Sequence, residues 1–189
     1  KLGLLPGAGG TQRLPRIVGV EKALEMMVLG DPIDAQSALA CGLIDEIVDD
    51  LGIGARAFAQ KVIAENKPLT RVRDLEEKLQ PARDNPAIFE TYRKIVAKRA
   101  RGFDAPEAII QCIEDAVNKP FDEGLAEERR RFVALIAGTQ SAAQRHYFFA
   151  ERRANKIPDV TPDTPSIQIQ SVGVIGAGTM GGGISMNFL

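Results

Sequence analysis

The feature that most constrains this chain is a glycine-rich turn that follows a short β-branched run near its end. Residues 171–175 (SVGVI) predict a strand, and Gly176, Gly178 and Gly181 follow it with the spacing GxGxxG. In such a turn the first glycine allows the sharp bend, the second lets a pyrophosphate approach the backbone, and the third lets the next helix pack closely. The pattern therefore predicts that residues 171–189 form the first βα unit of a dinucleotide-binding Rossmann domain.

The turn by itself does not identify the dinucleotide. A lone GxGxxG also occurs in tight turns that bind nothing, and its place after a predicted strand and a linker favours the binding site. The acidic residue that would hydrogen-bond the ribose of NAD is expected about 20 positions further along, outside this sequence. The spacing therefore predicts a dinucleotide site without choosing between NAD and NADP.

Residues 1–67 mix turns, short helices and one brief strand. A glycine-rich turn at residues 6–10 predicts the start of a helix with Thr11 as its N-cap. A further short helix, capped by Asp34, precedes residues 43–48 (LIDEIV), which predict a strand. We therefore expect this zone to be part of an α/β domain.

Residues 68–156 carry one-sided apolar stripes at helical spacing, which predict at least four helices. The charged runs at residues 127–131 and 151–153 are interpreted as solvated helix faces without a ligand. Residues 157–170 contain prolines among small and polar residues, so we expect an extended linker there. The predicted fold class is α/β, mostly helical in this chain.

Composition excludes several classes of function. The 24 basic and 25 acidic residues nearly cancel, so no field attracts nucleic acid or an anionic membrane surface. The apolar stretches are shorter than the roughly 20 residues that span a bilayer. Cys41 and Cys112 stand far apart, which indicates free thiols in a reducing compartment. His146 is the only histidine, so we expect no multi-histidine metal site.

Both ends of the sequence resemble positions in the interior of a longer chain. Lys1 stands where a complete chain would have methionine, and Leu189 lies inside an apolar, helix-like run. We therefore expect an internal fragment of a longer protein. Apolar helix faces such as Met26, Met27 and Leu29 would then lack their usual cover, which favours association.

Residues 2–16 (LGLLPGAGGTQRLPR) resemble one of the most specific stretches of the crotonase family, the enoyl-CoA hydratases and isomerases. The resemblance continues through residues 23–48 and covers residues 1–67. Residues 121–153 are similar to the linker-helix region of multifunctional β-oxidation enzymes, and residues 172–183 resemble the start of the 3-hydroxyacyl-CoA dehydrogenase domain. The chain thus resembles the C-terminal part of a crotonase fold, a helical linker and the opening of an NAD-binding domain, in the order of that family.

The resemblance implies a mechanism and a place for each reacting group. Water adds to a 2-enoyl-CoA thioester with two glutamates as acid and base, and a dehydrogenase then oxidises the (S)-3-hydroxyacyl-CoA with NAD. Of the hydratase site, only Gly7 falls within this sequence, near the catalytic water. The glutamates and oxyanion donors are expected upstream, and the dehydrogenase histidine and glutamate downstream. We therefore interpret Glu21, Glu25 and His146 as surface or structural groups and expect the fragment itself to be inactive.

Two other interpretations stay open. In one, the helices of residues 69–155 are a noncatalytic connector or assembly module of the longer enzyme. In the other, the chain is a monofunctional crotonase homologue with an accidental glycine motif. The resemblance also implies an acyl-CoA substrate, association with a thiolase or self-association, and a compartment that is the cytoplasm in a bacterium or the peroxisome in a eukaryote.

Overall fold

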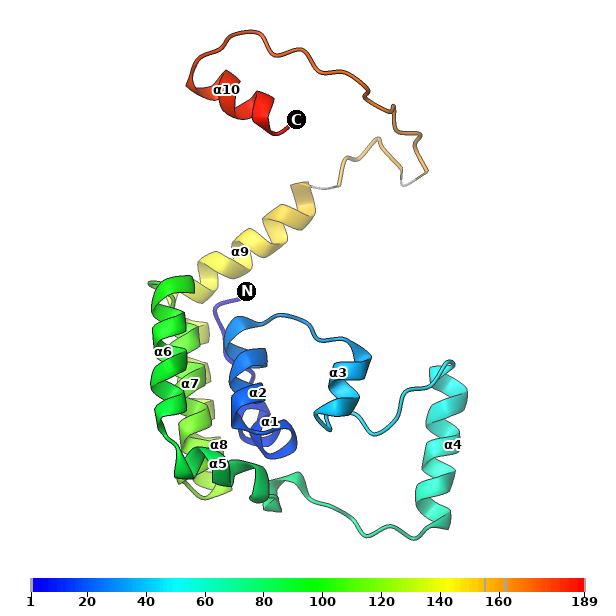
Figure 1. The fold of residues 1–189 in the computed structure, drawn as a ribbon, viewed down its shortest axis with the longest axis vertical. Coiled ribbons are helices and arrows are strands. Elements are labelled where there is room, and N and C mark those ends of the chain that lie inside the picture. The colour runs from blue at the N-terminus through cyan, green and yellow to red at the C-terminus, as the bar shows by residue number, and fades with distance from the viewer. Residues whose placement is uncertain (1, 155, 162, 189) are drawn as a thin grey trace. The chain divides into compact units, whose positions relative to one another are not determined.

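Helices form the regular secondary structure of this chain, which the computed structural model describes for residues 2–154, 156–161 and 163–188 (Figure 1). In chain order the elements are α1 (Gly10–Val18), α2 (Val20–Leu24), the π-helical turn η1 (Glu25–Leu29), α3 (Ala35–Ala40), α4 (Leu51–Ala64), the 3₁₀ turns η2 (Val72–Asp74) and η3 (Glu77–Leu79), α5 (Gln80–Asp84), α6 (Ala87–Arg99), α7 (Asp104–Asn118), α8 (Phe121–Ala137), α9 (Thr139–Ala154) and α10 (Thr179–Met186). The chain divides into two compact units, residues 1–150 and 151–189.

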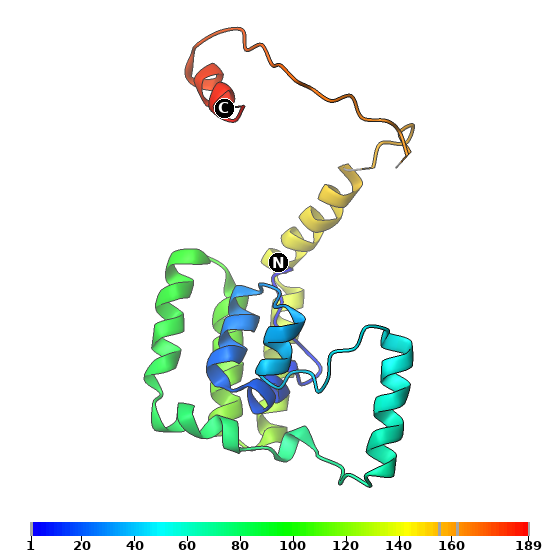
Figure 2. The same cartoon turned by 45° about the vertical axis from the view of Figure 1, so that its right-hand side comes forward.

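The first unit is built around α1, which packs against α2, α7 and α8. Both views place α1 and α2 beside α7, which also contacts α6 and α8 (Figures 1 and 2). Ile109, Ile110, Ile113 and Val117 form the buried stripe of α7, and each is at most 4% exposed. Because this stripe packs with apolar residues of α1 and α2, the N-terminal segment and the helical region share one hydrophobic core.

The helices predicted in residues 68–156 are confirmed. The four apolar stripes form α6, α7, α8 and α9. In the first zone Asp34 caps α3 as predicted, because its side chain accepts a hydrogen bond from Ser37 N at 2.7 Å. Gly30 ends η1 in the left-handed conformation, with φ 71°.

The described residues are mostly helical, as predicted, but they contain none of the strands expected for the α/β class. The strand predicted at residues 43–48 is absent. Leu43 N and Ile44 N instead donate to Ala38 O, at 2.9 and 3.4 Å, and extend the turn that closes α3. Residues 171–175 are extended but unpaired, because a strand needs a neighbouring strand for its backbone hydrogen bonds and no described segment supplies one. The helix expected after the glycine turn does form, as α10.

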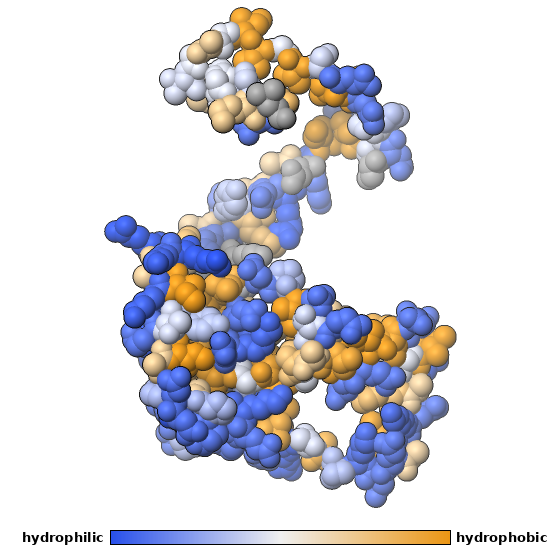
Figure 3. Space-filling view, viewed as in Figure 1, coloured by the Kyte–Doolittle hydropathy of each residue, from blue (hydrophilic) through white to orange (hydrophobic). Residues whose placement is uncertain are grey.

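Apolar side chains are exposed along α4, where Leu51, Ile53 and Ile63 are 78%, 72% and 77% exposed. The space-filling view shows apolar residues gathering over α3 and α4 (Figure 3). The uncovered face expected at residues 26–29 is half-buried instead, because η1 contacts α7. Apolar side chains are therefore more exposed on α4 than at residues 26–29.

Candidate functional site

A tight turn leads into α1. Gly7 O accepts a hydrogen bond from Gly10 N at 3.0 Å, and Ala8 and Gly9 take left-handed conformations with φ 54° and 81°. The Arg13 guanidinium donates to Ala8 O at 2.6 Å. Because a left-handed backbone is unfavourable for alanine, contacts from outside the turn are needed to hold it.

Glu128 supplies such contacts from α8. Its Oε1 accepts a hydrogen bond from Gly9 N at 2.7 Å, and its Oε2 accepts bonds from Thr11 N at 3.0 Å and Thr11 Oγ1 at 2.5 Å. The side chain is 1% exposed. The N-cap predicted at Thr11 is wrong, because Gly9 occupies that position and the Thr11 hydroxyl donates to Glu128.

The interpretation of residues 127–131 as a solvated face is wrong for Glu128, which is buried. Glu128 follows Phe121 by about two helical turns, and both side chains are buried on one side of α8. Glu127 and Arg130 pair with each other at 2.8 Å and remain accessible. Helical spacing from Phe121 was the signal in the sequence that could have placed Glu128 inside.

Two polar side chains of α1 are buried against α7. Gln12 Nε2 donates to Cys112 O at 2.8 Å. Arg16 donates to Ala116 O at 3.3 Å and to Gln12 O at 2.6 Å. Burial lowers the pKa of Arg16, and the carboxylate of Glu76, 3.6 Å away, partly offsets this effect. These bonds hold the body of α1 to α7, whereas the α8 carboxylate holds its first residues.

A cavity of about 870 Å³ opens beside Gly7. The turn forms one wall, and Leu125, Ala126, Arg129 and Phe132 of α8 lie along another. A Cβ at Gly7 would lie 3.3 Å from Phe132 Cδ2, closer than ordinary contact, so the missing side chain keeps this part of the cavity open. The mostly apolar lining suits an organic group more than an ion.

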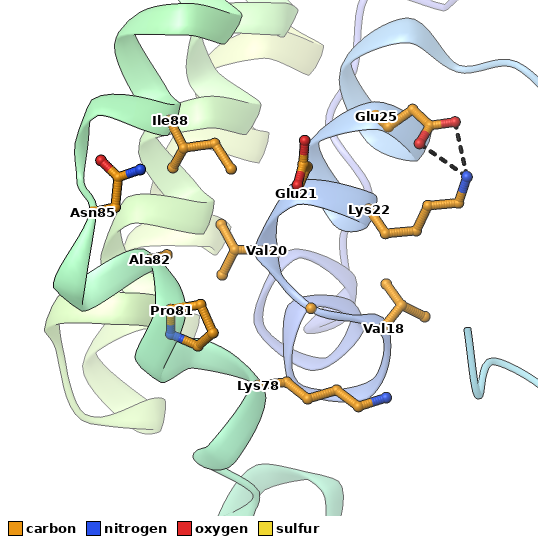
Figure 4. A pocket seen from close by; sticks show the side chains of 11 residues that line it. Val18, Val20, Glu21, Lys22, Glu25, Lys78, Pro81, Ala82, Asn85 and Ile88 are labelled. Atoms are coloured by element: carbon orange, nitrogen blue, oxygen red, sulfur yellow. Dashed lines mark hydrogen bonds and ion pairs between the residues drawn. The ribbon is translucent and has the colours of Figure 1, made fainter. Parts of the chain in front are cut away.

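A second cavity, of about 540 Å³, lies between α2 and α5 (Figure 4). Lys22 Nζ binds both carboxylate oxygens of Glu25, at 2.8 and 2.9 Å, and Glu21 is exposed. Because Lys22 neutralises Glu25, the described residues of this cavity provide no pair of free carboxylates for acid–base chemistry. His146 is exposed on α9.

In the second unit, Gly176, Gly178 and Gly181 surround the start of α10. Gly176 has φ 100°, which favours glycine, and Gly178 is the N-cap, with no neighbouring atom within 4 Å of the place of a Cβ. A Cβ at Gly181 would overlap the carbonyl oxygen of Gly176. At Gly182 and Gly183, a Cβ would meet no neighbouring atom within 4 Å. Gly176 and Gly181 therefore each favour glycine for a steric reason, whereas the space beside Gly178 is open.

The two cysteines are free thiols, with Cys41 half-buried and Cys112 buried. Burial raises the pKa of the Cys112 thiol. The described part of the chain holds no group of three or more His, Cys, Asp and Glu side chains placed to bind a metal ion. Over the same residues, no helix combines the length and the apolar character needed to cross a bilayer.

Residues 1–88 match the enoyl-CoA hydratase/isomerase family. Over nearly its whole length the chain is also similar to the fatty acid oxidation complex subunit alpha of Shewanella loihica, with 39% identity over 98% of this chain and 26% of the relative. The peroxisomal bifunctional enzyme of Homo sapiens is 37% identical over 99% of this chain and 26% of its own length. The glyoxysomal fatty acid beta-oxidation multifunctional protein of Cucumis sativus is 36% identical over 98% of this chain and 26% of its own length.

The chain spans about a quarter of the length of the curated relatives it matches. The resemblance to multifunctional β-oxidation enzymes, inferred from the motifs at both ends of the sequence, is confirmed by these comparisons.

Proposed function

We propose that this chain is part of a bifunctional β-oxidation enzyme, which hydrates 2-enoyl-CoA and oxidises (S)-3-hydroxyacyl-CoA with NAD. The observation that carries the proposal is one chain with both a hydratase-family match over residues 1–88 and a glycine turn of the phosphate-binding type at residues 176–181. Similarity to the multifunctional relatives covers 97–99% of the chain, so it includes both segments. A monofunctional homologue with an accidental glycine motif is therefore disfavoured.

In the hydratase step, water adds across the double bond, with the hydroxyl going to the β-carbon and the proton to the α-carbon. Gly7 borders the catalytic water in this proposal, and its missing side chain leaves the cavity open beside Phe132. The carboxylates that move the proton and the amides that stabilise the enolate-like intermediate are expected in residues outside this sequence.

In the oxidation step, NAD supplies the hydride acceptor. Gly176, Gly178 and Gly181 fit its pyrophosphate, because the turn is open at Gly178 and the helix start presents backbone amides. A histidine and a glutamate for proton transfer are expected beyond this sequence.

The domain layout follows from these assignments. Residues 1–67 are the C-terminal part of the hydratase domain, and residues 68–156 are the helical linker region. Residues 157–170 are the proline-rich linker, and residues 171–189 begin the NAD-binding dehydrogenase domain. The catalytic groups of both steps lie outside this chain, so the chain alone is inactive.

The direct test assays two reactions, hydration of crotonyl-CoA and NAD-dependent oxidation of 3-hydroxybutyryl-CoA. Both are measured with this chain and with a protein extended at both ends. We expect both activities in the extended protein and neither in the chain alone. Activity in the chain alone would contradict the absence of catalytic groups, and an extended protein without either activity would refute the proposed function.

The NAD site has its own test, with a matched pair of variants in the extended protein. Gly181→Ala forces a Cβ against the Gly176 carbonyl, whereas Gly182→Ala adds a Cβ that meets no neighbouring atom. Overpacking typically costs about 1–3 kcal/mol, so we expect Gly181→Ala to weaken NAD binding by about tenfold or more. Equal NAD dissociation constants for the two variants would contradict the proposal that this turn binds NAD.

A connector role is the second candidate, and one observation favours it. Helices α7 and α8 pack directly on α1, so the helical region completes a core that begins in the hydratase segment. This role is compatible with the first. We also propose that α4, with its exposed apolar side chains, contributes to association with a second copy or with a thiolase subunit. By likeness to the relatives, the compartment in a eukaryote would be a peroxisome or glyoxysome. In a bacterium we expect the cytoplasm.

A further inference from the structure

We infer that Glu128 is a positioning residue for the hydratase step, because from α8 it fixes the turn that places Gly7 beside the catalytic water. The inference rests on the proposed function, since it gives Glu128 a part in that reaction. In this proposal Glu128 acts through the backbone of the turn, whose amides at Gly9 and Thr11 it binds.

The first step of the argument is the set of bonds that end on this carboxylate. Three donors from Gly9 and Thr11 converge on it from more than 110 positions earlier in the sequence. Both residues belong to the start of α1, where backbone amides have no acceptor within the helix. A carboxylate is favoured at this end of a helix, and charge-assisted bonds are stronger than neutral ones. Because Gly7 O is bonded to Gly10 N, the position of Gly7 follows that of the helix start.

The second step concerns the other contact that α8 makes with Gly7. Phe132 follows Glu128 by one helical turn, so both side chains project from one face of α8. The Phe132 ring lies against Gly7, where a Cβ would approach within 3.3 Å of it. Helix α8 therefore holds the backbone of the turn through Glu128 and bounds the adjacent cavity through Phe132.

The third step separates positioning from general stability. The body of α1 is held to α7 by Gln12 and Arg16, which donate to Cys112 O and Ala116 O. These bonds do not involve Glu128. Loss of the carboxylate therefore leaves α1 docked and releases mainly its first residues and the turn.

The test uses Glu128→Gln in the extended protein, with Glu127→Gln as the matched control on the accessible side of the same helix. The amide keeps the shape of the side chain but loses its charge and turns an NH₂ group toward donors of the turn. Misplacement by about 1 Å can cost roughly 100-fold in rate, so we expect Glu128→Gln to lower the hydratase kcat by about 10- to 100-fold. The KM for enoyl-CoA, the dehydrogenase kcat and the activity of Glu127→Gln should stay close to those of the unmodified protein.

Thr11 provides a second pair of variants, which decides the question if Glu128→Gln does not fold. Thr11→Ser keeps the hydroxyl that donates to Glu128 and should retain the hydratase kcat. Thr11→Val removes that hydroxyl at similar volume and should lower kcat without raising KM.

Two results would overturn the inference. One is an unchanged hydratase kcat in Glu128→Gln or in Thr11→Val. The other is a fall in kcat matched by the dehydrogenase activity and by the folded fraction, which would show a purely structural role. An unmodified protein with no hydratase activity would instead refute the proposed function, so the two failures are distinguishable.

Discussion

For the substitution Gly124→Ala on α8, helix propensity predicts a gain in folding stability, whereas packing predicts a loss. Alanine is favoured over glycine in a helix interior by about 1 kcal/mol. A Cβ at Gly124, however, would overlap Gln12 Oε1 and lie 2.9 Å from Gln12 Cδ. The absence of a side chain at Gly124 therefore lets Gln12 of α1 pack directly against the backbone of α8.

The size of the stability change depends on whether the Gln12 side chain can move away from the new methyl group. Its side chain is 0% exposed and donates to Cys112 O at 2.8 Å and to Thr11 Oγ1 at 3.1 Å. Displacing it leaves buried polar groups without partners, which costs about 1–3 kcal/mol. Overpacking adds about 1–3 kcal/mol. Against the propensity gain of about 1 kcal/mol, we expect a net destabilisation of about 1–5 kcal/mol.

The assay is denaturant unfolding of the extended protein, with hydrogen exchange of α8 amides to assign the transition to the first unit. Gly182→Ala is the control, because its Cβ meets no neighbouring atom and only the propensity gain applies. Combining Gly124→Ala with Gln12→Ala should restore part of the loss, since the double variant removes the overlap. Stabilisation by Gly124→Ala would refute the close packing of α8 on α1.

Three further predictions concern other parts of the first unit. In a thiol-labelling time course read by peptide mass, Cys41 should react much faster than Cys112, because Cys112 is buried and burial raises its pKa; equal rates would contradict this. The Ser37 amide that donates to Asp34 lowers the pKa of Asp34, so the ionised cap stabilises the fold above the unfolded pKa of about 3.9, and this stabilisation is lost as pH falls through the lower folded value. Asp34→Asn keeps a capping side chain, so its difference in melting temperature from the unmodified protein should shrink in acid; a difference independent of pH would be inconsistent with the cap. The isolated chain should associate through α4, and sedimentation as a monodisperse monomer would argue against this.

The parts of the fold that depend on local pattern could be predicted from the sequence. Helices α6 to α9 follow from apolar residues at helical spacing, and the cap at Asp34 follows from residue type and position. The glycine motif also constrains its own geometry, because Gly176 has φ 100° and Gly181 has no room for a Cβ. These features are set by contacts within a few residues.

The strands and the partners of α1 could not be predicted in the same way. Residues 43–48 have strand-like composition, but their first amides bond to the end of α3 and no described strand lies beside them. Glu128 sits in a charged run that is typical of a solvated face, yet it is buried because α8 turns that position toward the start of α1. Each outcome depends on a neighbour that is distant in sequence.

The sequence by itself indicated the resemblance to multifunctional β-oxidation enzymes, because residues 2–16 and the glycine turn at residues 176–181 carry that information. Only the tertiary structure decided what holds the turn around Gly7 in place. A carboxylate in the middle of a charged helix looks the same in sequence whether it faces water or a helix start. Its surroundings were decided by the docking of α8 on α1, which brings Glu128 within 3.0 Å of backbone donors of Gly9 and Thr11.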